Sequence, residues 1–109
     1  GRVKIIPKTT INEAPHKIPH IGWNNLLPTK NNNWQNTLLD GLPSGISMYF
    51  VHSFTAYPRN ADHRLADADY NGRTVSAVIQ RENLTGFQCH PEKSGEIGLR
   101  VLKNFVSLN

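Results

Sequence analysis

The sequence is poor in cysteine, in charge and in long apolar segments. Its 109 residues include a single cysteine, Cys89, which excludes an internal disulfide framework and a zinc site built from several thiolates. One reduced thiol is typical of a reducing compartment, so we expect a cytoplasmic protein. No apolar run approaches the roughly 18 residues needed to span a bilayer, and Gly1-Arg2-Val3-Lys4 lacks the apolar core of a signal peptide. We therefore expect no contact with a membrane.

Charged residues make up 18% of the chain, and the 12 basic residues exceed the 8 acidic ones to give a formal net charge of +4. The basic residues are scattered singly, so a nucleic-acid partner is not expected. His16, His20 and His63 have no ligand-like partners at set spacing, so we do not expect a metal site. We expect no cofactor either. With 38% hydrophobic residues, the composition is not that of a disordered chain. The length fits one small domain or part of a larger one.

Most of the chain has the pattern of short strands. Residues 47–54 form a continuous β-rich run, which predicts a buried strand. Asn71-Gly72 separates two strand-like segments and favours a two-residue antiparallel hairpin. Residues 18–24 contain Pro and Gly, which indicates an edge strand or a structured loop. Strands are expected at 3–6, 47–54, 65–70, 74–80 and 84–89.

Helical spacing is limited to two segments. Residues 34–39 are expected to form one or two helical turns that end at Gly41. From Ser94, the expected N-cap, apolar residues recur at helical spacing; they are Ile97, Val101, Leu102, Phe105 and Leu108. So few helices leave much of one sheet face without cover, which is not typical of a complete doubly wound α/β domain.

The residues with the clearest chemical potential are His90-Pro91-Glu92, where a strand gives way to a helix. In an extended segment residues i and i+2 share a face, so His90 and Glu92 are expected within about 2.6–3.2 Å. The carboxylate would fix the imidazole tautomer and leave the other ring nitrogen to take a proton. The alternative is a strand-end salt bridge. In the same extended segment Cys89 is expected to point to the opposite face, so if His90 and Glu92 are catalytic, their nucleophile lies outside these residues.

Three segments in register resemble a known family. Gly86-Phe87-Gln88-Cys89-His90-Pro91-Glu92-Lys93-Ser94 is similar to the C-terminal signature of the class I (triad) glutamine amidotransferases. Pro19-His20-Ile21-Gly22-Trp23-Asn24 and Tyr49-Phe50-Val51-His52-Ser53-Phe54 narrow the resemblance to the glutaminase subunits of imidazole glycerol phosphate synthase. Members of that family are roughly twice as long, and the similarity covers their C-terminal half. The resemblance implies the C-terminal part of a flavodoxin-like α/β domain, with antiparallel strands and a C-terminal helix.

The resemblance also implies a reaction. A cysteine from the N-terminal half of the domain, absent from residues 1–109, attacks the amide of glutamine, and ammonia passes to a (β/α)8-barrel cyclase that makes imidazole glycerol phosphate for histidine biosynthesis. Matched by motif, His90 is the general base and acid and Glu92 orients it. Because the nucleophile is missing, residues 1–109 alone are expected to be inactive.

Further site residues follow from the same resemblance. His52, Ser53 and Phe54 match the strand end that holds the α-amino and carboxylate groups of glutamine. Phe54 stands where Tyr is frequent, and Cys89 where Phe is frequent. The alternative for His52 is a hydrogen-bonded strand histidine. Four residues match positions that face the cyclase in a heterodimer: Trp23, Asn24, Tyr49 and Lys93. The alternatives are core packing for Trp23 and a solvated side chain for Lys93.

Two other functions remain open. A paralogous amidotransferase that feeds ammonia to a surface-sugar or other pathway carries the same glutamine-hydrolysing motifs. A non-catalytic fragment that only binds a partner is the third possibility, and only the half of the domain that holds the nucleophile would distinguish it.

Overall fold

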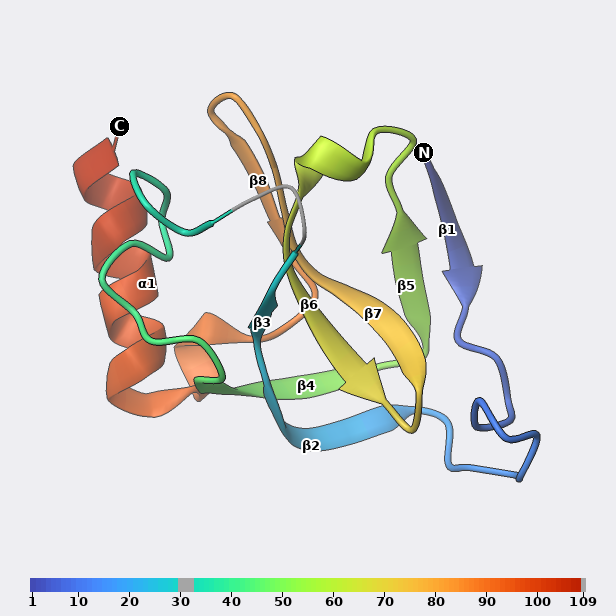
Figure 1. Ribbon diagram of the computed structural model, residues 1–109. Helices are drawn as coiled ribbons and strands as arrows, with labels where there is room; N and C mark the ends of the chain where they lie inside the picture. Colours follow the sequence, from blue (N-terminus) through green and yellow to red (C-terminus); the bar gives the residue numbers. More distant parts are fainter. Residues whose placement is uncertain (30–32, 109) are drawn as a thin grey trace.

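A computed structural model describes residues 1–29 and 33–108, except for the side chain of Leu108. The described elements are mostly short strands, followed by one long helix (Figure 1). In chain order they are β1 (Arg2–Ile5), β2 (His20–Asn25), β3 (Leu27–Pro28), β4 (Ser47–His52), β5 (Phe54–Tyr57), the 3-10 turn η1 (Ala61–His63), β6 (Arg64–Tyr70), β7 (Arg73–Arg81), β8 (Leu84–Phe87), the 3-10 turn η2 (Pro91–Lys93) and α1 (Gly95–Leu108).

The described strands pair antiparallel throughout, as the sequence predicts. β3, β6, β7 and β8 form a sheet in that order, while β1 pairs with β5 and β2 pairs with β4. The expected turn joins β6 to β7, where Asn71 and Gly72 both have positive φ, 54° and 86°. Positive φ at both central residues matches the right-handed twist of the hairpin. In Figure 1 the β2–β4 pair lies in the lower part of the view, and its strands run across the direction of β6 and β7.

Helix α1 confirms the expected C-terminal helix. Val101 is fully buried in the core and Ile97 packs against it, so the predicted stripe faces inward at these positions. Asn104 donates from Nδ2 to the carbonyl of Leu38 over 2.9 Å, which joins the helix to the turns after Trp34. Leu108 is the last residue of the expected stripe, and its side chain lies outside the described part of the chain.

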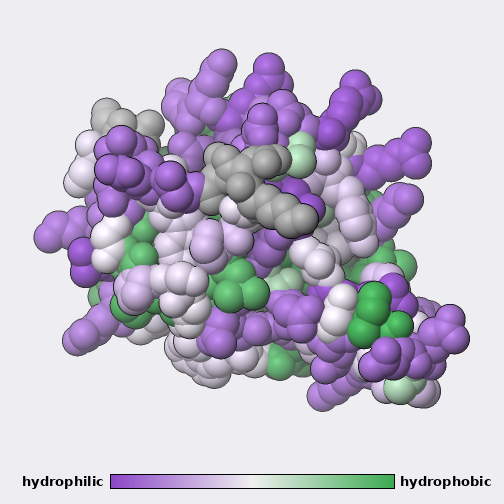
Figure 2. Space-filling model, in the orientation of Figure 1, coloured by the Kyte–Doolittle hydropathy of each residue, from purple (hydrophilic) through white to green (hydrophobic). Residues whose placement is uncertain are grey.

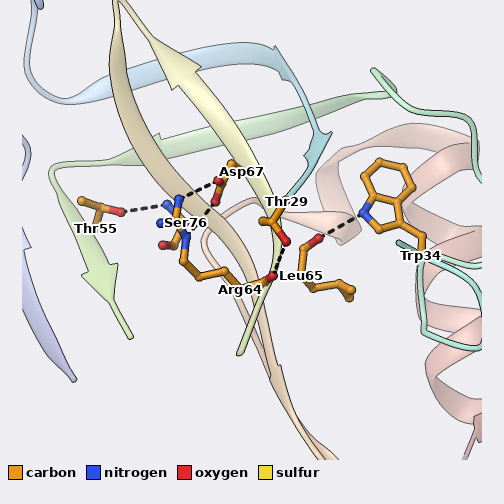
Figure 3. Close-up of polar contacts among 7 residues, drawn as sticks. All are labelled: Thr29, Trp34, Thr55, Arg64, Leu65, Asp67 and Ser76. Carbon is orange, nitrogen blue, oxygen red and sulfur yellow. Dashed lines mark hydrogen bonds and ion pairs between the residues drawn. The ribbon is translucent and has the colours of Figure 1, made fainter. Parts of the chain in front are cut away.

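Two expected elements are wrong in detail. Residues 34–41 form a series of turns rather than a helix; Trp34 nevertheless reaches the core, where its indole N–H donates to the carbonyl of Leu65 over 3.1 Å (Figure 3). The run 47–54 is not one strand, because it bends at Ser53. β4 pairs with β2 before the bend and β5 pairs with β1 after it. The bend arises because the chain changes its partner strand at Ser53, and a local sequence pattern does not encode such a change.

Strand β5 is tied to the large sheet by a side chain. Thr55 is buried and its hydroxyl accepts a hydrogen bond from the backbone N–H of Ser76, at 3.1 Å (Figure 3). On β6, Arg64 pairs with Asp67 at 2.6 Å in the same region. The Thr55–Ser76 bond holds the β5 end of the bend at Ser53 against β7.

Part of the apolar surface is left uncovered. Val3, Leu84, Leu99 and Val106 are between 63% and 72% exposed. On the face drawn in Figure 2, apolar residues form separate small areas within a mainly hydrophilic surface. An open cavity of about 760 Å³ lies between the β1–β5 pair and the β7–β8 hairpin, and Val3 and Leu84 line it. None of the described helices has the length and apolarity to cross a membrane.

Candidate functional site

Strand β4 fixes the segment that carries His90. The carbonyl of Tyr49 accepts the backbone N–H of His90 at 2.8 Å, and the N–H of Tyr49 donates to Oγ of Ser94 at 3.0 Å. Ser94 in turn donates from Oγ to the carbonyl of His90 at 2.6 Å. The hydroxyl of Ser94 therefore joins β4 to the His90 segment, rather than making the side-chain helix cap that the sequence suggested. The backbone of His90 is held at both ends.

His90 and Glu92 are hydrogen bonded. Nδ1 of His90 lies 3.0 Å from Oε1 of Glu92, and the two side chains are 35% and 55% exposed. The expected contact is present, but its expected cause is wrong. Only His90 is extended, and a 3-10 turn begins at Pro91 and carries Glu92 back beside the ring. Proline at the first position of the turn supplies the fixed φ that this geometry needs.

This geometry suits a proton shuttle. A carboxylate only accepts, so Nδ1 of His90 carries the proton that bonds to Glu92. In the neutral ring, Nε2 is then unprotonated and accepts a proton from an approaching group. Glu92 is placed to stabilise the imidazolium that would result. The geometry is that of a base and its orienting carboxylate, and the pair includes no nucleophile.

Cys89 does not fill the missing role. Its side chain belongs to the buried core, and its sulfur lies 4.0 Å from the carbonyl of Ala77. Burial raises the pKa of the Cys89 thiol to about 12. Because the thiolate is the nucleophile, Cys89 stays protonated and inert at neutral pH, as expected from the sequence.

The bend between β4 and β5 carries the expected substrate-binding residues. His52 is buried; its Nδ1 contacts the carbonyl of Phe54 at 2.7 Å and its Nε2 contacts Nδ1 of His20 at 2.9 Å. Both ring nitrogens of His52 are thus occupied by groups of this chain. His52 therefore matches the alternative expectation, a hydrogen-bonded strand histidine. Ser53 is half-buried at the bend, and Phe54 is 53% exposed.

His20 was missed as part of this site. The sequence around His20 gives no signal, because its partner His52 is 32 residues away and the two residues meet only when β2 pairs with β4. In that register His20 lies directly opposite His52. No regular spacing of histidines along the chain relates His20 to His52, so the sequence alone does not pair them.

The expected partner-facing residues divide between two faces of the β2–β4 pair. Trp23 and Tyr49 are opposite each other and their rings meet edge to face, 5.9 Å between centroids. Trp23 is 58% exposed, and Lys93 is exposed on the adjoining turn. Asn24 alternates to the other face, where Nδ2 donates to the carbonyl of Asp69 at 2.9 Å. The outward aromatic surface therefore includes Trp23 and Tyr49 but not Asn24.

Gly98 allows α1 to approach the His90 segment. A Cβ at this position would lie 1.9 Å from the carbonyl oxygen of Pro91. We predict that Gly98→Ala in the full-length protein lowers the free energy of unfolding by about 3 kcal/mol, because backbone must move to relieve this overlap. Lys103→Ala, an exposed change on the same helix, should stay within about 0.5 kcal/mol. Urea unfolding measures both, and equal stabilities would contradict the close approach.

Among the described residues, no three His, Cys, Asp or Glu side chains are grouped as a metal site. The cavity between β1–β5 and β7–β8 does not include His90, Glu92 or Ser53 among its lining residues. The candidate site is thus the edge formed by β4, the bend at Ser53 and the His90–Glu92 pair.

Comparisons with known proteins place this chain in a family. Residues 4–108 match the family described as glutamine amidotransferase class-I. The chain is 48% identical over 109 residues to imidazole glycerol phosphate synthase subunit HisH 1 of Legionella pneumophila (strain Lens), covering 99% of this chain and 51% of the relative. It is 44% identical over 107 residues to subunit HisH of Wolinella succinogenes, covering 96% and 49%. The subunit HisH of Archaeoglobus fulgidus is 44% identical over 92 residues, covering 84% and 44%.

The chain spans about half the length of these curated relatives. The family match runs over almost all of it, and the antiparallel strands and C-terminal helix agree with the fold expected from the sequence. The chain belongs to the class I glutamine amidotransferases.

Proposed function

We propose that the full-length protein hydrolyses glutamine and delivers the ammonia to a cyclase subunit that makes imidazole glycerol phosphate in histidine biosynthesis, in the cytoplasm. The observation that carries the proposal is the His90–Glu92 hydrogen bond of 3.0 Å, on a segment held against β4, in a chain of this family. The names of the similar proteins, subunits of imidazole glycerol phosphate synthase, support the choice of pathway.

In the proposed reaction, a cysteine from the preceding half of the domain gives its proton to Nε2 of His90 and attacks the amide carbon of glutamine. The carbon–nitrogen bond then breaks, and His90 returns the proton to the leaving ammonia. Water attacks the thioester, loses a proton to His90 and releases glutamate, and the thiol is restored. Glu92 keeps the ring oriented throughout.

The uncovered apolar surface supports a preceding half that completes the domain. Val3 on β1, Leu84 on β8 and Leu99 on α1 are all more than 60% exposed. Burial of apolar area contributes about 25 cal/mol per Å², so these surfaces favour contact with further chain. We propose that the same preceding half carries the nucleophilic cysteine and the donors for the oxyanion.

The outward face of the β2–β4 pair supports a partner beside the His90 segment. Ile21 and Val51 are paired across the two strands, next to the Trp23–Tyr49 pair, and all four residues share one face. Ile21 is 49% exposed. Aromatic side chains with a polar rim, here including Lys93, are typical of interface anchors. We propose that the cyclase docks on this face.

This docking face yields a prediction. Trp23→Ala in the full-length protein should weaken binding of the cyclase subunit about 30-fold, the usual scale for an aromatic anchor. Glutamine hydrolysis without the cyclase should change little, because the Trp23 ring packs on Tyr49 and takes no part in the His90–Glu92 hydrogen bond. Ile11→Ala, an exposed apolar residue on the loop between β1 and β2, is the control. Titration calorimetry measures the affinities, and unchanged binding for Trp23→Ala would place the partner elsewhere.

The test of the proposed function follows nitrogen. Full-length protein, the cyclase subunit with its own nitrogen-accepting substrate, and glutamine labelled with 15N in its amide should give labelled imidazole glycerol phosphate. Glutamate release without transfer to that product would favour the paralogous amidotransferase. Failure to release glutamate in the presence of the cyclase would refute the proposal.

A further inference from the structure

Two buried histidines face each other beneath the candidate site. His20 on β2 and His52 on β4 are directly paired in the strand register, and they are 3% and 9% exposed. Nδ1 of His20 lies 2.9 Å from Nε2 of His52. The proposed mechanism uses neither ring as a base, although buried polar groups without a satisfied partner are costly.

The surrounding atoms determine where the protons lie. A carbonyl only accepts, so the contact of 2.7 Å to Phe54 requires a proton on Nδ1 of His52. In a neutral ring Nε2 of His52 then accepts, and Nδ1 of His20 donates to it. Nε2 of His20 is left as the acceptor for Nδ2 of Asn24, at 3.4 Å. Every hydrogen bond in this series runs in one direction, from Asn24 to Phe54, with both imidazoles neutral.

We propose that His20 is a positioning residue: by donating to Nε2 of His52, it holds His52 as the neutral Nδ1–H tautomer that clamps the β4–β5 bend at Ser53 and keeps a second positive charge away from His90. The inference rests on the proposed function, because it assigns His20 a role in glutamine hydrolysis at that bend. This role also gives His52 a function in the expected glutamine-binding segment, although both nitrogens of its ring are occupied within the chain.

The clamp acts on the backbone that is expected to hold glutamine. The His52 ring reaches forward two residues to the Phe54 carbonyl, across Ser53. On the other side of the bend, the carbonyl of Ser53 accepts the backbone N–H of Ile6 at 2.8 Å. With these two bonds the direction of the chain at Ser53 is fixed. Loss of the His52 clamp would let the bend move and would weaken glutamine binding.

The electrostatic surroundings favour the neutral state. Burial, then the neighbouring His52 and His16, lower the pKa of His20 to about 4. Burial also lowers the pKa of His52; the Phe54 carbonyl opposes this, and His90 adds to it. The groups that face the pair are His16, His90, the ring of Tyr70 stacked on His20 at 4.2 Å, and the apolar ring of Phe50. A charge on His52 would disfavour the imidazolium that His90 must form.

Two variants of the full-length protein separate this role from simple core filling. In His20→Asn the amide Nδ2 takes the place of Nδ1 and keeps a donor to His52. In His20→Phe the stacking on Tyr70 and Phe50 is kept, but the donor is lost. Thermal unfolding of both variants, measured first, defines the temperature at which both are folded.

The first readout is the 15N spectrum of the His52 ring between pH 5 and 8, which needs no activity. Where the His52 ring is neutral, we expect the Nδ1–H tautomer in the wild type and in His20→Asn. In His20→Phe the pKa of His52 should rise by about one unit, because one neutral hydrogen bond to the unprotonated nitrogen is lost. An Nε2–H tautomer in the wild type, or identical titration in all three proteins, would overturn the inference.

The second readout is glutamine hydrolysis. His20→Phe should raise KM for glutamine about tenfold with kcat changed less, while His20→Asn restores most of the affinity. Equal kinetics for the two variants would overturn the positioning role. If the wild type releases no glutamate even with the cyclase present, the proposed function fails and the role in hydrolysis falls with it. The 15N spectrum then reports separately whether His20 fixes the tautomer of His52.

Discussion

Residues 1–109 on their own should release no glutamate from glutamine above the buffer rate, whereas the full-length protein should turn glutamine over. The reason is chemical: in the proposed mechanism residues 1–109 hold only the proton shuttle, His90 with Glu92, and their one cysteine is a buried thiol whose pKa is raised to about 12. Acyl transfer also needs donors for the developing oxyanion, and loss of a single donor typically costs about 10² to 10³ in rate. A glutamate dehydrogenase-coupled assay measures the release.

The control for this prediction is Cys89→Ala in the full-length protein. Because Cys89 lies in the core with its sulfur near the Ala77 carbonyl, its removal should leave kcat within about threefold, at a cost of about 1 kcal/mol in stability. Turnover by residues 1–109 that disappears on Cys89→Ala would show that this cysteine is the nucleophile. Adding the preceding half as a separate chain should restore activity to residues 1–109.

The second large effect concerns the base itself. His90→Ala in the full-length protein should lower kcat for glutamine hydrolysis about 10³-fold, because general acid–base catalysis contributes about 10² to 10⁴. Glu92→Gln keeps an acceptor for Nδ1 of His90 but loses the charge that stabilises the imidazolium, and should cost about 10- to 100-fold. Steady-state kinetics over pH 6 to 9 gives kcat and KM separately, so a loss of catalysis in either variant is distinguished from a change in glutamine binding.

His63→Ala provides the matched control. His63 lies in η1 and lines the cavity beside β1 and β5, apart from the residues of the candidate site, so its removal should leave kcat unchanged within about twofold. Should His90→Ala keep more than a tenth of the wild-type kcat, the assignment of His90 as the base would be wrong. A Glu92→Gln loss as large as that of His90→Ala would indicate that Glu92 also acts directly on the reacting groups.

The sequence by itself determined the elements whose causes are local. Asn71-Gly72 favours positive φ at both positions, and the structure has the β6–β7 hairpin there. The spacing of Ile97 and Val101 predicted α1. The motif around His90 and Glu92 identified the family, which the comparison confirms, and their hydrogen bond was also expected.

Tertiary structure alone decided the remaining features, because their causes lie far apart in the chain. Residues 34–41 are drawn into turns by the packing of Trp34 on β6 and by α1, whose Asn104 bonds to the carbonyls of Leu38 and Asp40. The run 47–54 bends at Ser53 because β4 and β5 pair with different strands. His20 meets His52 across 32 residues, and Asn24 turns inward to β6 while Trp23 faces outward. Local propensity sets a turn or a helix, but register between distant strands decides which side chains meet at the site.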